Sequence, residues 1–160
     1  MGGLGGLTPQ VPRNFLVQVM ARTDHLPIYK ASYDLCLYFE QVVRNFSRYH
    51  KYSLGADLRD GARRVLKLVV RANARRDKAP ILQEIREEVE ELKAVLRLCE
   101  DVKAFPNFNS FEHSFRLVTE IAKQNEGWLK SQPSIRARRD GVLFGPARGP
   151  SNATTTRVAE

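Results

Sequence analysis

The chain has 160 residues, 42% of them hydrophobic, and a formal net charge of +8 at pH 7. This length is typical of a single domain with a hydrophobic core, and no apolar run approaches the roughly 20 residues that a membrane span requires. The N-terminus lacks the basic region and apolar stretch of a secretory signal, so we expect a cytoplasmic protein that does not associate with membranes.

Composition divides the chain into three parts. Residues 1–24 and 133–160 are rich in Gly and Pro, which predicts disordered N- and C-terminal extensions around a domain at residues 25–132. The C-terminal extension is mildly basic because it contains Arg136 and Arg138–Arg139. We therefore expect the fold to lie within residues 25–132, with a tail that is able to add contacts to a polyanion.

Apolar residues at spacings of three and four predict four helices. Pro106 ends the third, Asn109 or Ser110 caps the fourth, and Pro133 follows the fourth. No segment alternates in the manner of a strand. Helices of this length with short linkers predict an all-α protein, an antiparallel up-down four-helix bundle. The predicted ranges are 28–46, 54–75, 80–105 and 110–132, with a loop at 47–53.

Two of these helices carry more apolar surface than a four-helix core needs. Tyr33 and Leu37 widen the apolar stripe of the first helix to most of its circumference, and Leu66 and Val70 lie beside the core stripe of the second. A helix that is apolar nearly all round is typically buried on more than one side. We therefore predict an oligomer interface at Tyr33, Leu37, Leu66 and Val70.

Positive charge is concentrated on the second helix. The segment from Arg44 to Lys78 contains eleven Lys or Arg and three Asp or Glu, while the other 125 residues carry equal numbers of each sign. A localised cationic surface attracts phosphate through counterion release. Basic residues recur every four positions behind the apolar face, at Arg59, Arg63, Lys67, Arg71 and Arg75.

This pattern predicts binding to a nucleic acid. Tyr49 and Tyr52 in the loop are able to stack on unpaired bases, although covering the end of the bundle is the favoured interpretation. A solvated basic face, or docking on the acidic third helix of a neighbouring subunit, remains an alternative. The predicted phosphate contacts are Arg59, Arg63, Arg64, Lys67, Arg71, Arg75 and Arg76, with Arg48 and Lys51 in second rank.

The chain offers little for catalysis. His25, His50 and His113 lie in different segments at no ligand spacing, and Glu-x-x-His is absent, which argues against a metal site. Cys36 and Cys99 lie in helical apolar patterns and are expected as small buried residues. We therefore predict a protein that is not an enzyme and holds no metal or cofactor.

Five short segments stand out in chain order: Leu26–Lys30, Phe46–Arg48, Tyr52–Gly55, Arg71–Asn73 and Gly127–Lys130. Together they resemble the Avd (accessory variability determinant) proteins of diversity-generating retroelements. The similarity covers about residues 25–132 and extends to a wider group of four-helix-bundle proteins encoded in intervening sequences of 23S ribosomal RNA genes. Ser47 stands where the family usually has Pro, which affects the turn.

The resemblance implies a function that composition does not. Avd proteins form barrel-like homopentamers that bind the retroelement's reverse transcriptase and template-region RNA, and they support mutagenic cDNA synthesis without catalysing it. The resemblance thus implies these partners here. The alternatives are a protein of the 23S ribosomal RNA intervening-sequence type with no polymerase partner, and a purely structural homo-oligomer without nucleic acid.

Overall fold

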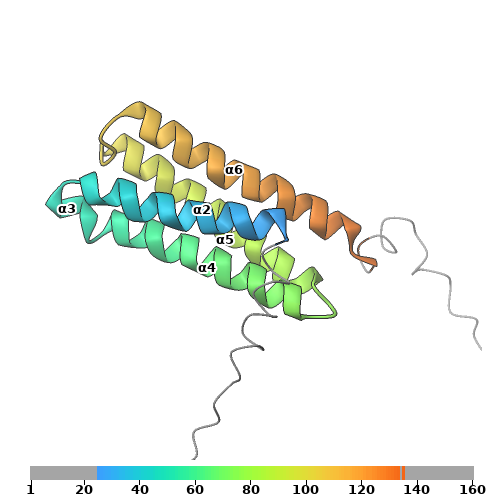
Figure 1. Cartoon of the computed structure of the whole chain (residues 1–160). Helices are drawn as coiled ribbons and strands as arrows, with labels where there is room; N and C mark the ends of the chain where they lie inside the picture. The colour runs from blue at the N-terminus through green and yellow to red at the C-terminus, as the bar shows by residue number, and fades with distance from the viewer. Residues whose placement is uncertain (1–24, 134, 136–160) are drawn as a thin grey trace, which may run out of the picture.

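The computed structural model describes residues 25–133 and 135, and this part of the chain is helical with no strand (Figure 1). The predicted all-α fold is confirmed. The first helix, predicted over 28–46, is α-helical only to Val42 and continues as a 3-10 turn, and the loop expected at 47–53 contains one short helix. The elements are α2 (Pro27–Val42), η1 (Val43–Asn45), α3 (Arg48–Lys51), α4 (Leu54–Ala74), α5 (Ala79–Asp101) and α6 (Phe108–Ser131).

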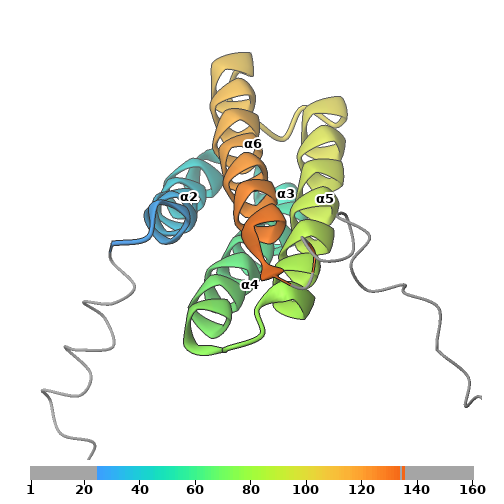
Figure 2. The ribbon, with the colours of Figure 1, turned by 90° about the vertical axis from the view of Figure 1, so that its right-hand side faces the viewer.

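The four long helices surround one core, and each packs against two neighbours (Figure 2). The contacting pairs are α2–α4, α4–α5, α5–α6 and α2–α6, and we call the surface groove along each pair a seam. Short connections make sequence neighbours antiparallel. The ring closes where the Tyr38 hydroxyl of α2 donates to the Ser110 carbonyl of α6 at 3.2 Å.

The core contains the apolar stripes that spacing predicts. On α2, Leu35 and Phe39 are completely buried, and on α4 Leu58, Val65 and Val69 are equally inaccessible. Each stripe covers about a third of its helix, which is the width needed to close a four-helix core. Burial of these side chains is therefore the main force that holds the helices in register.

Helix α6 departs from the sequence prediction at its start and along its core face. Its N-cap is Asn107, whose side-chain oxygen accepts the backbone N–H of Ser110 at 2.9 Å, so the predicted cap at Asn109 or Ser110 is wrong. Asn125 lies in the core face although it is polar. Its amide nitrogen donates to the Leu82 carbonyl of α5 at 2.9 Å, which compensates for burial of the nitrogen, while the side-chain oxygen has no hydrogen-bond partner among the described residues.

Helix α5 ends at Asp101, earlier than the predicted Phe105, because the chain turns at Lys103. Lys103 has a φ of 54°, in the left-handed region. The Ala104 N–H bonds to the Cys99 carbonyl at 2.8 Å, and the Lys103 N–H bonds to that of Glu100 at 3.0 Å. This is a Schellman end, a position that favours glycine. Val102, the C-cap of α5, is exposed.

The predicted extensions lie almost entirely outside the described residues, and the basic positions Arg136, Arg138 and Arg139 lie outside them as well. The division of the chain into three parts therefore stays a prediction. Among the residues described, no helix is both long and apolar enough to cross a membrane.

Candidate nucleic-acid interface

The basic stripe of α4 winds around its helix instead of forming one face. Four residues advance an α-helix by about 400°, so each step along the stripe rotates by about 40°. The stripe therefore starts near the α2–α4 seam at Arg59 and Arg63. It crosses the outer surface at Lys67 and reaches the α4–α5 seam at Arg71.

At the α2–α4 seam, a carboxylate of α2 holds the first two arginines. The Glu40 carboxylate lies 2.9 Å from a guanidinium nitrogen of Arg63 and 3.8 Å from one of Arg59. Arg63 also donates to Asp60, one turn earlier on α4. This hydrogen bond raises the pKa of Arg63 and lowers that of Asp60. Both cations are thus neutralised locally.

At the α4–α5 seam, the acidic surface of α5 pairs with α4 of the same chain. Arg64 Nε donates to Glu88 at 2.7 Å, and Arg71 pairs with Glu84. This hydrogen bond to Glu88 raises the pKa of Arg64. These carboxylates therefore do not need the basic helix of a neighbouring subunit for neutralisation.

The nine predicted phosphate contacts divide into two groups. Arg59, Arg63, Arg64 and Arg71 have carboxylate partners. The side chains of the other five make no ion pair within residues 25–133. These five cations are available to an anionic partner without displacing a carboxylate. They are Lys67, Arg75, Arg76, Arg48 and Lys51.

Two of these free cations lie on α3, at one end of the bundle beside the α5–α6 connection (Figure 1). Phe46, just before α3, packs edge-on against Phe105 of that connection, with ring centroids 5.1 Å apart. The Ser47 hydroxyl accepts the His50 N–H at 3.4 Å and caps the helix. A Cβ on Gly55 would meet Val43 at 2.5 Å, so a glycine is needed where α3 joins α4.

The two tyrosines of this end do not cover the bundle. Tyr49 is 82% exposed and Tyr52 is 74% exposed, so the favoured sequence interpretation is wrong. Phe108 in the neighbouring turn is also exposed. A polar loop pattern does not indicate which way an aromatic ring points. We call Arg48, Tyr49, Lys51 and Tyr52 the α3 tip.

The predicted interface residues line the α2–α4 seam. Glu40 of α2 pairs with Arg63 of α4 across this seam, and antiparallel packing then brings the segment from Tyr33 to Leu37 alongside the segment from Leu66 to Val70. Tyr33 and Leu37 are each 47% exposed, Val70 is 37% exposed, and Leu66 is partly buried. These four residues, the apolar strip, therefore lie at one seam and remain accessible.

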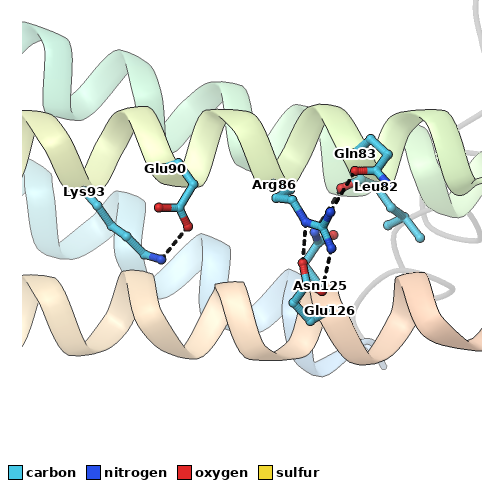
Figure 3. Close-up of polar contacts among 7 residues, drawn as sticks. All are labelled: Leu82, Gln83, Arg86, Glu90, Lys93, Asn125 and Glu126. Atoms are coloured by element: carbon cyan, nitrogen blue, oxygen red, sulfur yellow. Dashed lines mark hydrogen bonds and ion pairs between the residues drawn. The ribbon is translucent and has the colours of Figure 1, made fainter.

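On the opposite side of the bundle, the α5–α6 seam contains a groove of about 770 Å³. Arg86 binds both carboxylate oxygens of Glu126 at 2.6 Å, and Lys93 pairs with Glu90 at 2.7 Å (Figure 3). The Arg86 hydrogen bonds lower the pKa of Glu126. Four of the six charged residues that line the groove are thus paired.

No group of three or more His, Cys, Asp or Glu among the described residues is arranged to hold a metal ion. Burial raises the pKa of Cys36 to about 11 and that of Cys99 to about 12, so both thiols are protonated at neutral pH.

A family model described as bAvd-like matches residues 26–132, which is the four-helix domain. A comparison with curated proteins finds no significant match. The matched range begins one residue before α2 and ends one residue after α6, so the similarity spans the whole bundle, including α3.

Proposed function

This chain belongs to the bAvd-like family, and we propose that it acts as a non-catalytic accessory protein of a diversity-generating retroelement. In this role it binds the reverse transcriptase and template-region RNA and supports mutagenic cDNA synthesis. The observation that carries the proposal is the family match over the complete bundle.

The charge distribution supports the RNA-binding part of the proposal. The side chains of five predicted contacts make no ion pair within residues 25–133, and they lie on the outer surface of α4, at its C-terminal end and on α3. Cations without a carboxylate partner bind phosphate by releasing condensed counterions from the nucleic acid. This provides affinity with little sequence information. The identity of the RNA would then be recognised through its shape or through the polymerase.

We also propose that the apolar strip joins copies of this chain, as a homopentamer if the family resemblance extends to stoichiometry. An exposed apolar strip flanked by charged residues is typical of a protein–protein interface. Sedimentation of L37D and V70D variants tests this. Both should reduce the oligomer to smaller species, while L98D, at an exposed leucine on α5, should not. An unchanged oligomer in both strip variants would contradict the assignment.

Co-purification tests the function as a whole. The tagged protein is co-expressed with the reverse transcriptase encoded nearby and its template-region RNA, then washed with ~0.5 M salt, which weakens non-specific phosphate contacts. Recovery of both polymerase and RNA supports the accessory role. Recovery of a salt-resistant oligomer alone would overturn it and favour the structural homo-oligomer or the relative linked to ribosomal RNA.

A further inference from the structure

The α3 tip combines two cations with Tyr49 and Tyr52, which are the two most exposed of the Phe, Tyr and Trp side chains within residues 25–133. Arg48 directly precedes Tyr49 and Lys51 directly precedes Tyr52, and neither cation forms an ion pair within residues 25–133. Residues 41–56 contain no Asp or Glu. The tip is therefore cationic without the local carboxylates that accompany the arginines of α4.

The two tyrosines are placed on the same side of the tip. Residues three apart on a helical turn differ by about 60° around the axis, with Cβ atoms about 5–6 Å apart. Tyr52 still has helical backbone angles as the C-cap of α3, so this spacing applies to Tyr49 and Tyr52. The Tyr49 ring also packs edge-on against His50, with centroids 5.0 Å apart, which restricts its movement.

Exposure of two neighbouring rings is unfavourable unless something covers them. Each tyrosine leaves most of its apolar ring in water, and neither ring packs against the hydrophobic core. A partner suited to this site has flat apolar surfaces that stack on the rings and negative charges, between those surfaces, that meet the cations. An unpaired nucleic-acid strand has these two properties, whereas a duplex hides its base faces.

We infer that the α3 tip is a base-stacking site for single-stranded RNA, in which Tyr49 and Tyr52 stack on unpaired bases while Arg48 and Lys51 contact the adjoining phosphates. This inference rests on the proposed RNA-binding function and makes it more specific. It assigns a preference for unpaired segments to one end of the bundle. The cations of α4 contact phosphate in single and double strands alike.

The test measures fluorescence anisotropy of the full-length protein with a labelled 12-nucleotide single-stranded RNA and with the duplex of the same sequence. The variant Y49A/Y52A removes both rings, and Y49F/Y52F is the matched control that keeps them. Since both side chains are exposed, neither variant should change the melting temperature. We expect Y49A/Y52A to lose at least tenfold in single-strand affinity and less than twofold in duplex affinity. The phenylalanine variant should bind both RNAs as the unmodified protein does.

Three results would overturn the inference in distinguishable ways. Unchanged single-strand affinity of Y49A/Y52A would remove the stacking role and leave RNA binding intact. An equal loss on both RNAs would show that the rings only position the cations. Failure of the unmodified protein to bind either RNA would overturn the proposed function together with this inference.

Discussion

The basic stripe of α4 and the α3 tip differ in how their charges are balanced. On α4, four of the predicted arginines pair with Glu40, Glu84 and Glu88, which lie on the helices at either side. At the tip, Arg48 and Lys51 have no carboxylate partner within residues 25–133. The density of positive charge along a sequence therefore does not by itself identify the cations that are available to a phosphate.

The largest expected difference follows from removing the same number of charges in each region. We expect R48Q/K51Q to lower affinity for single-stranded RNA about tenfold and to reduce the slope of log K against log salt by ~1.4, since each lost contact contributes ~0.7. R64Q/R71Q, which removes two paired arginines, should lower affinity less than ~3-fold. Fluorescence anisotropy titrations at several salt concentrations measure both. A greater loss in the α4 variant would reverse the comparison.

Displacing the tip without changing its charge is the next test. We expect G55A to lower the free energy of unfolding by about 1–3 kcal/mol, because its Cβ would lie 2.5 Å from Val43. RNA affinity should fall with it as α3 shifts. G127A is the matched control, since nothing lies within 4 Å of its added Cβ. Chemical denaturation should show G127A to be more stable by about 0.5–1 kcal/mol. Equal stability of both variants would show that α3 does not need the glycine.

Freeing the paired arginines should make α4 behave more like the tip. We expect E84Q/E88Q to raise RNA affinity roughly 2–10-fold, because Arg71 and Arg64 lose their internal counterions. E87Q/E91Q alters the net charge equally, and neither glutamate forms an ion pair within residues 25–133, so this variant separates the effect of hydrogen-bonded pairing from that of net charge. Filter binding at one salt concentration compares them. Identical gains would indicate that only net charge matters.

The connection beside the tip offers a smaller effect on stability. K103G should raise the melting temperature by a few degrees, because glycine adopts the left-handed backbone of the Schellman end without strain. The substitution also removes the ion pair between Lys103 and Glu100, but such a surface ion pair contributes little to the free energy of unfolding. Calorimetry measures the shift, and RNA affinity should stay the same. A lower melting temperature would contradict the assigned strain.

Lowering the pH should weaken the contribution of α4 to the free energy of unfolding and leave that of the α3 tip unchanged. The hydrogen bond from Arg63 holds the pKa of Asp60 below its usual range. The stabilisation of the folded state by ionised Asp60 is therefore complete above the pKa of Asp60 in the unfolded chain, and it is lost as the pH falls through the lower pKa of the folded state. We expect the free energy of unfolding to decline below about pH 4, and less steeply in D60N. R48Q/K51Q should follow the curve of the unmodified protein. Identical curves for D60N and the unmodified protein would contradict the role of Asp60.

The helices and most of the core could be predicted from sequence because spacing alone determines which residues share a helical face. Leu35, Phe39 and Val65 fall in such stripes and are buried. Asn125 could not be predicted as a core residue, since its burial depends on a carbonyl of α5 that only the folded bundle brings near.

The candidate site was predictable in composition but not in detail. A four-residue repeat of basic residues predicts a stripe that winds around its helix. The identity of the helices on either side of α4, however, follows only from the packing order of the bundle. The exposure of Tyr49 and Tyr52 depends on how a short connection folds back on Gly55. Local patterns do not determine such a conformation.

The order of packing around the core also has a consequence for folding. Three of the four seams join helices that follow one another in sequence, and only the α2–α6 seam brings distant segments together. A fold dominated by local contacts forms quickly, on the microsecond to millisecond scale for helical bundles. The hydrogen bond from Tyr38 to Ser110 spans the α2–α6 seam, so a variant such as Tyr38→Phe reports on when the ring of helices closes during folding.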